Sequence, residues 1–280
     1  MHIQYVKILR RDPWFLFAAL LAGLLLVILL AGSWLSPHDP FDISFTPLER
    51  PSKEHWLGTN DGGMDIWAEL LAGLRNTVSF GLVAGLAGAA LAIIAGVVAA
   101  CRNGLTDHVL MRLGDILLAL PSIMVTLLLA ALFRPPAWGL ACILALLAWP
   151  GPAKTIRAQT LALQGSLHVQ AARHMGGSPL YILIRHILPE LFPLGVIAII
   201  SRIRSAVFME ASLAFLGLLD PMRKSLGKMI QHGLGYYYLD IWGNWLLPPL
   251  ICLCLLLLSL TLMGVSLEKL FDPRMRETNQ

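Results

Sequence analysis

Residues 78–101 read VSFGLVAGLAGAALAIIAGVVAAC, a run of apolar and small residues without a single charge. The hydrocarbon core of a bilayer is about 30 Å thick, and about 20 helical residues cross it. This run is long enough to do so as an α-helix. We therefore expect an all-α, polytopic membrane protein.

The composition of the whole chain supports a membrane class. Of its 280 residues, 57% are hydrophobic and only 14% are charged, with a mean hydropathy of +0.71. An ordinary soluble domain is about 45–50% apolar. The net charge of +4 is better explained by the placement of loops on one membrane side than by nucleic acid. We predict no nucleic-acid partner.

Further long apolar runs accompany the first. Pro121 should kink the third run, and Pro150 and Pro152 should kink or unwind the fourth, for which a re-entrant segment is the alternative. Counting each run as one span predicts six transmembrane helices with both termini on the same side. The predicted spans are 14–34, 78–101, 109–133, about 138–156, about 191–213 and about 245–265.

The basic residues predict which side that is. Most of the 21 Lys and Arg residues fall on the side of the termini, so the positive-inside rule places both termini in the cytoplasm. The first run could instead be a cleaved signal peptide, because it has a basic start and ends in Ala31-Gly32-Ser33. Its apolar stretch is longer than the usual 7–15 residues, so we expect a transmembrane helix.

One polar stretch interrupts the apolar chain between the fourth and fifth spans. Residues 169–190 read VQAARHMGGSPLYILIRHILPE. We predict a short amphipathic helix at about 166–176, ended by Gly176-Gly177, with a new start at Ser178-Pro179. Leu167, Ala171 and Met175 share one face of it. The helix could lie flat on lipid headgroups, but its small alanines favour docking to another protein.

This stretch carries a family resemblance. Gln170-Ala171-Ala172, Gly176 and Ile187-Leu188-Pro189 resemble the "EAA loop" of bacterial ABC-transporter permeases, with Gln170 in place of the usual Glu. Four further segments are similar to the second, C-type permease subunit of the dipeptide/oligopeptide/nickel branch. They are residues 185–189 (RHILP), residues 55–60 (HWLGTN) with Asp65, residues 211–218 (ASLAFLGL) and residues 270–274 (LFDPR). Asn60 and Met64 stand where that branch usually has Asp and Arg.

The resemblance implies a type I ABC importer permease fold. Residues 1–76 would form the cytoplasmic tail, the first transmembrane helix and a periplasmic loop, and residues 77–280 a five-helix core with a cytoplasmic coupling helix at about 166–176. That helix would dock on an ATPase. The residues expected to couple to it are Gln170, Ala171, Ala172, Arg173, Met175, Gly176 and Pro189.

The same resemblance implies the partners. They are a second, homologous permease subunit in a heterodimer, two cytoplasmic ATPase subunits, an extracytoplasmic substrate-binding protein and the bacterial inner membrane. The chain contains no G-x-x-x-x-G-K-[ST] motif, and the nearest fragment is Leu226-Gly227-Lys228-Met229. We expect no catalytic residue and no bound cofactor here, with ATP and Mg held by the ATPase subunits. No spacing of Cys or His predicts a metal site.

Two arginines lie near the middle of the fifth span. Arg202 and Arg204 would each cost about 2.5–3.5 kcal/mol against lipid, so each should face a polar lumen or a partner. Residues two apart point to nearly opposite sides of a helix. We expect one of them to line the translocation pathway and to hold a substrate carboxylate or an anionic chelate, with Glu210 as a further candidate. Alternatively both form structural pairs, one with Glu210. Asp115 should pair with Arg112.

The function predicted is that of a permease subunit which imports small peptides, or nickel or metal chelates. A secondary transporter driven by an ion gradient is the alternative. Such proteins show broken helices in corresponding positions of two halves, and only the fourth span is clearly interrupted here. A membrane-embedded enzyme would need catalytic groups for which the sequence offers no candidate arrangement.

Overall fold

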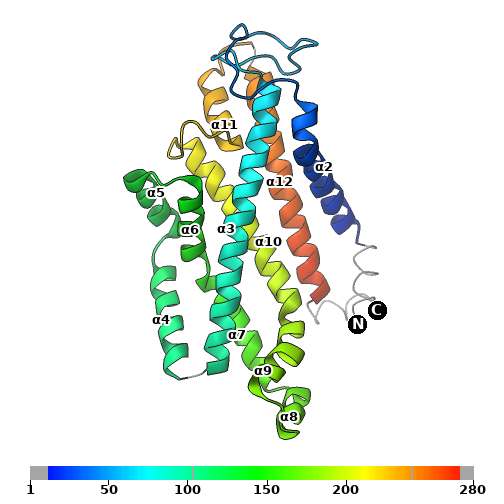
Figure 1. Cartoon of the computed structure of the whole chain (residues 1–280), viewed down its shortest axis with the longest axis vertical. Coiled ribbons are helices and arrows are strands. Elements are labelled where there is room, and N and C mark those ends of the chain that lie inside the picture. The colour runs from blue at the N-terminus through cyan, green and yellow to red at the C-terminus, as the bar shows by residue number, and fades with distance from the viewer. Residues whose placement is uncertain (1–11, 103, 241, 272–280) are drawn as a thin grey trace.

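The computed structural model describes residues 12–102, 104–240 and 242–271 (Figure 1). These residues form a bundle of helices. The long loop between the first two helices, residues 36–65, contains an isolated bridge between Thr59 and Asp65. The helices are α2 (Pro13–Leu35), α3 (Ile66–Arg102), α4 (Leu105–Ala119), α5 (Ser122–Phe133), α6 (Ala137–Ala148), α7 (Pro150–Gln164), α8 (Leu167–His174), α9 (Pro179–Ile182), the π-helical turn η1 (Leu183–Ile187), α10 (Leu188–Phe215), α11 (Leu226–Gly235) and α12 (Trp242–Phe271).

Four continuous stretches are long and apolar enough to cross a membrane. They are Pro13–Gly32, Ile66–Arg102, Pro179–Phe215 and Trp242–Lys269. Two bent helix pairs pass the same test together, so the described chain has up to six spans if each pair is one span. The predicted breaks at Pro121 and Pro150 are confirmed, with a bend of 79° between α4 and α5 and of 45° between α6 and α7. Proline removes a helix hydrogen bond and clashes with the preceding turn, which explains both bends.

Helix α3 runs along the whole bundle and contacts α10, α7 and α6 (Figure 1). Glycine permits the closest of these contacts. A Cβ on Gly85 would lie 2.5 Å from the Cα of Ile203 on α10, and one on Gly96 would lie 2.6 Å from the carbonyl oxygen of Ala153 on α7. Helices in a membrane associate through such backbone approach, because lipid removes most of the hydrophobic driving force between them.

The two ends of the bundle differ. Helices α8 and α9 lie at one end and α11 and the loop before α3 at the other, and the end of α12 is directed towards the end that carries α8 (Figure 1). The termini lie outside the described residues, so their placement on one side, in the cytoplasm, stays a prediction. Helix α2 packs against α12, and its Leu25 is buried in the core there.

The predicted domain division and the C-terminal motif do not coincide with described elements of the fold. The expected division between residues 76 and 77 lies inside α3, which begins at Ile66. Three residues of the C-terminal motif, Asp272, Pro273 and Arg274, lie outside the described residues.

Replacing Gly85 by alanine should destabilise the bundle. The new Cβ would force α3 and α10 apart, and overpacking of this kind typically costs about 1–3 kcal/mol. We expect a lower midpoint of thermal unfolding in detergent. Gly23→Ala is the matched control, because a Cβ at Gly23 meets nothing within 4 Å. Equal midpoints for the two variants would contradict the role assigned to Gly85.

Candidate coupling and translocation sites

The short helix α8 forms where the sequence predicts it. Ser166 precedes it in an extended conformation, and the helix ends at His174 with Met175 as its C-cap, after which Gly176 takes a left-handed φ of +84°. A side chain at that φ is strained, so glycine ends the helix here. The next helix begins with Pro179, and the Ser178 hydroxyl caps it by accepting a hydrogen bond from the amide of Tyr181.

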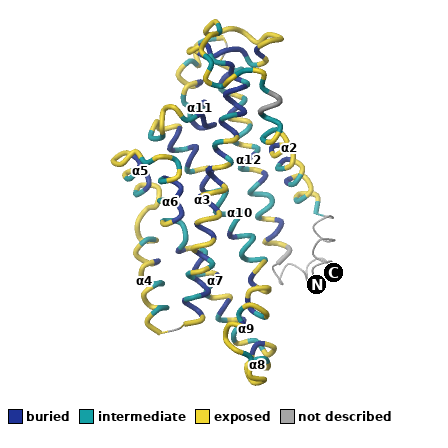
Figure 2. Tube along the Cα trace, viewed as in Figure 1, coloured by how far each residue is buried: buried dark blue, intermediate teal, exposed yellow. Residues whose placement is uncertain are grey.

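Helix α8 lies at the tip of the bundle, and most of its residues are exposed (Figure 2). Leu167 is 85% exposed and Met175 is 89% exposed, and Ala171 between them is exposed as well. This is the face predicted from the i, i+4 spacing. On the other side of the helix, Val169 is fully buried and Ala172 is partly buried in a cluster with Ile187. The buried side fixes α8 to the bundle, and the exposed side is available to a partner.

Gln170 is used inside the chain. Its side-chain amide donates a hydrogen bond of 2.9 Å to the carbonyl oxygen of Gly165, at the end of α7. A glutamate, the residue usual in the family motif, could not donate this bond. A second link joins His168 to Glu190 in the first turn of α10, with 2.9 Å between Nε2 and Oε1. Thus α8 is tied to both neighbouring helices.

The other predicted coupling residues lie nearby. Arg173 and Gly176 are exposed on the same tip, whereas Pro189 is exposed in the first turn of α10. The structure thus keeps six of the seven residues on α8 or at its end and places Pro189 at the base of α10.

At the opposite end, the segment HWLGTN is a structural anchor. His55 Nδ1 lies 3.0 Å from Asp65 Oδ1, and both side chains are buried. The second carboxylate oxygen of Asp65 accepts a hydrogen bond of 2.8 Å from the amide of Ala68. This bond satisfies an amide in the first turn of α3, which explains why α3 begins where it does.

A buried ion pair joins this segment to the loop before α11. Lys224 Nζ lies 3.0 Å from Glu69 Oε1, and the side chains are 10% and 8% exposed. The amide of Asn60 donates a bond of 3.0 Å to the other oxygen of Glu69. We call Asn60, Glu69 and Lys224 the outer lock. Sequence analysis missed it because the three residues are up to 164 positions apart (224 − 60).

The departures from the family pattern fit this lock. An aspartate at position 60 could not donate to Glu69 when ionised. The sulfur of Met64 lies 3.1 Å from Lys224 Nζ, so an arginine there would place a second cation beside the lysine. Asn60 and Met64 are therefore matched to the buried Lys224–Glu69 pair.

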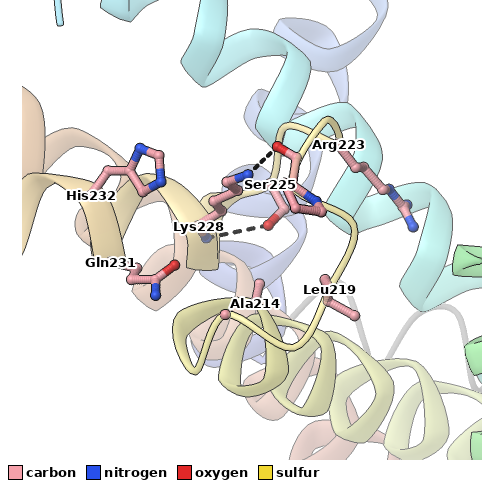
Figure 3. Close-up of a pocket in the computed structure, with 9 residues that line it drawn as sticks. Ala214, Leu219, Arg223, Ser225, Lys228, Gln231 and His232 are labelled. Atoms are coloured by element: carbon pink, nitrogen blue, oxygen red, sulfur yellow. Dashed lines mark hydrogen bonds between the residues drawn. The ribbon is translucent and has the colours of Figure 1, made fainter. Parts of the chain in front are cut away.

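A small cavity of about 190 Å³ lies beside the lock, between the end of α10 and α11. Figure 3 shows Arg223 and His232 on opposite sides of it, so their side chains do not converge on one point. Burial and the nearby Lys224 ammonium hold the pKa of Lys228 below its usual value. Tyr236 donates a hydrogen bond of 2.8 Å to Asp61, which raises the pKa of the tyrosine.

A larger cavity of about 340 Å³ lies midway along the bundle. We call it the central cavity. Arg202 lines it and donates a bond of 3.1 Å to the carbonyl oxygen of Ala148, at the break between α6 and α7. Arg204 instead reaches Thr261 on α12, at 3.5 Å. The two arginines point to different neighbours, as their spacing predicts.

Two predicted pairs are corrected. The fully buried Glu210 accepts a hydrogen bond of 3.1 Å from Thr77 on α3 rather than pairing with either arginine. Asp115 pairs with Lys154, and not with Arg112, because the kinked spans bring α4 and α7 side by side. Both corrections concern contacts between residues far apart in the chain.

The described residues include no group of three or more His, Cys, Asp or Glu side chains that could hold a metal ion. The central cavity contains further polar groups that sequence reasoning did not single out. They are Ser122, Thr126 and Ser205. Hydroxyl residues occur throughout the spans, so only their place in the fold distinguishes them.

Comparison with known proteins defines the class. Residues 91–277 match the family described as binding-protein-dependent transport system inner membrane component. The chain belongs to this family, the permeases of ABC importers, and is a component of the inner membrane.

Its relatives lie in the branch that the motifs indicate. A probable D,D-dipeptide transport system permease protein of Escherichia coli (strain K12) is 31% identical, over 97% of this chain and 91% of that protein. An oligopeptide transport system permease protein of Bacillus subtilis (strain 168) is 28% identical, over 92% and 86%. A glutathione transport system permease protein of Pectobacterium atrosepticum is 29% identical, over 95% and 93%.

Breaking the outer lock from one side should be costly. Lys224→Met would leave the Glu69 carboxylate buried without its cation, and loss of one partner of a buried pair typically costs about 3–5 kcal/mol. We expect a marked drop in the midpoint of thermal unfolding in detergent.

The double variant Glu69→Gln/Lys224→Met should recover part of this loss, because no unpaired charge remains. Lys53→Met, at an exposed lysine of the same end, is the matched control and should be neutral. A Lys224→Met protein as stable as the control would show that the lock contributes nothing.

Proposed function

We propose that this permease forms half of the translocation pathway of an ATP-driven, binding-protein-dependent importer of small peptides. The observation that carries the proposal is the exposed face of α8, with Leu167 and Met175 almost fully exposed on a helix anchored by Val169. Exposed apolar side chains gathered at a projecting tip are typical of a protein interaction site. The partner on this face is one of two cytoplasmic ATPase subunits.

The fold supports a mechanical role for α8. It is bound to α10 through the His168–Glu190 pair and through the buried cluster around Val169. Residues Pro179–Phe215 form a single span-length helical stretch, which carries Arg202 at the central cavity and packs against α3. A displacement of α8 by the ATPases is therefore passed to the residues around the cavity.

The transport cycle is a population shift between two packed states. Closure of the ATPase subunits on ATP moves α8 and favours one state, and hydrolysis restores the other. ATP and Mg are bound by the ATPase subunits, and this chain contributes no catalytic residue. A second, homologous permease subunit completes the pathway, and an extracytoplasmic binding protein delivers the substrate at the end that carries the outer lock.

In this proposal each bent helix pair is one span, so the chain has six spans, a type I importer fold and both termini in the cytoplasm. Peptides are proposed as substrates because the similar permeases named above serve dipeptide, oligopeptide and glutathione transport. The suggestion that nickel or a metal chelate is transported rests only on the resemblance to the dipeptide/oligopeptide/nickel branch.

The alternative function is that of a secondary transporter driven by an ion gradient, and the positions of the helix breaks help to distinguish the two. Both spans for which the sequence predicts a proline kink are bent, by 79° between α4 and α5 and by 45° between α6 and α7. The two breaks lie in consecutive spans. In secondary transporters the broken helices occupy corresponding positions of two repeated halves. The arrangement therefore favours the importer.

Placing charge on the exposed face of α8 should uncouple the complex. We expect Leu167→Glu and Met175→Glu to weaken ATPase binding by about tenfold or more, as for a central interface residue. Co-purification of the ATPase subunits and ATP-driven peptide uptake in proteoliposomes measure this effect.

Leu105→Glu is the matched control, because Leu105 is 81% exposed at the start of α4, away from α8. It should leave both readouts near the unaltered level. If the α8 variants co-purify with ATPase subunits and transport as well as the control does, α8 is not the coupling element.

A further inference from the structure

The central cavity is bounded by both helix breaks. Leu120 and Ser122 line it from the break between α4 and α5, and Ala148 and Gly151 line it from the break between α6 and α7. Breaks of this kind leave backbone groups without helical partners. Where they occur at membrane depth, they are tolerated when they line a polar cavity.

The charge inside the cavity is unbalanced. Among the described residues that line it, Arg202 is the one that carries a charge. Its contact to Ala148 is to a neutral carbonyl group, and its Nε is buried without a hydrogen-bond partner. A buried cation is normally paired with an anion. The cavity thus has an excess positive charge that a ligand could neutralise.

A second feature of the cavity also favours an anion. Helix α5 has 12 residues and begins at Ser122 on the cavity wall, and no side chain caps its first turn. Free amides at a helix start attract negative charge. The hydroxyls of Thr126 and Ser205 already donate to the carbonyl groups of Ser122 and Ser201. Neither hydroxyl proton is therefore free to bind an anion, and the partly exposed oxygen of Ser205 can still accept a hydrogen bond from a ligand.

We propose that the central cavity binds the carboxylate of the transported substrate, an inference that rests on the proposed function. Arg202 and the start of α5 hold the carboxylate, since a guanidinium matches its two oxygens. The oxygen of Ser205, which is partly exposed, accepts from an N–H group of the same molecule. A peptide with a free C-terminus has both kinds of group next to each other.

Site-directed labelling of the whole importer complex in lipid nanodiscs tests this site. The substitution Ser205→Cys is made in a chain whose four native cysteines are replaced by Ser, because Cys101, Cys142, Cys252 and Cys254 are free. Two thiosulfonate reagents of similar size are compared, one with a sulfonate and one with a trimethylammonium group. Each rate is divided by the rate of the same reagent with a free thiol in solution. On this relative scale we expect the sulfonate reagent to react about tenfold faster, as attraction to one nearby partly buried charge allows.

Substitutions at the arginines identify the source of this preference. Arg202→Met should abolish it, and Arg202→Lys, which keeps the charge, should retain most of it. Arg204→Met is the matched control on the same helix and should leave it unchanged. Equal relative rates for the two reagents in the Ser205→Cys chain that keeps both arginines, or equal effects of Arg202→Met and Arg204→Met, would overturn the proposal. So would the absence of reaction with both reagents, because the cavity would then be closed to water.

Two further arms identify the ligand. Trialanine should protect the introduced thiol of the Ser205→Cys variant from the sulfonate reagent, and trialanine amide, which lacks the carboxylate, should not. Equal protection by both peptides would exclude carboxylate recognition. Protection by phosphatidylglycerol, but not by trialanine, in otherwise phosphatidylcholine nanodiscs would assign the site to a lipid phosphate instead. The labelling needs no ATP, so a failure of α8 coupling would leave this result readable.

Discussion

The close approach of α3 and α10 is the contact on which the other parts of this protein depend. Backbone atoms of the two helices come so near that a single Cβ at Gly85 would meet the Cα of Ile203 at 2.5 Å. Such proximity is specific, because packing without side chains between the helices allows few alternative registers. It fixes the position of Arg202, the neighbour of Ile203. It also fixes the direction in which α10 continues towards α8.

Two sets of polar side chains in the bundle differ in whether their hydrogen-bonding and charged groups are satisfied within the chain. At the outer end, both carboxylate oxygens of Glu69 are satisfied, one by Lys224 and the other by Asn60. In the central cavity, Arg202 has only a carbonyl partner and a buried Nε without one. A satisfied buried network rigidifies the structure around it, whereas an unbalanced charge favours a ligand. This difference indicates a structural role for the outer lock and a binding role for Arg202.

At two positions where the chain departs from the family motifs, the residue present makes a packing contact within the chain. Gln170 donates to Gly165, and Asn60 donates to Glu69. In both places the amide makes a bond that an ionised carboxylate could not make. The two amides therefore keep their elements in place through contacts within the chain.

Much of the architecture was predictable from sequence, because the signals are local. Apolar runs of bilayer length indicated the helices, prolines marked the two bends, and Gly176 marked the end of α8. These features depend on the chemistry of neighbouring residues, which a sequence displays directly. Motif order also indicated the family before any contact was known.

Only the tertiary structure decided which residues meet. It paired Asp115 with Lys154 rather than Arg112, turned Arg202 towards the central cavity and Arg204 towards α12, and separated Glu210 from both. The partners in these contacts lie 39 to 133 positions apart. Periodicity specifies which face of a helix a side chain occupies, but the packing of whole helices decides what lies opposite that face.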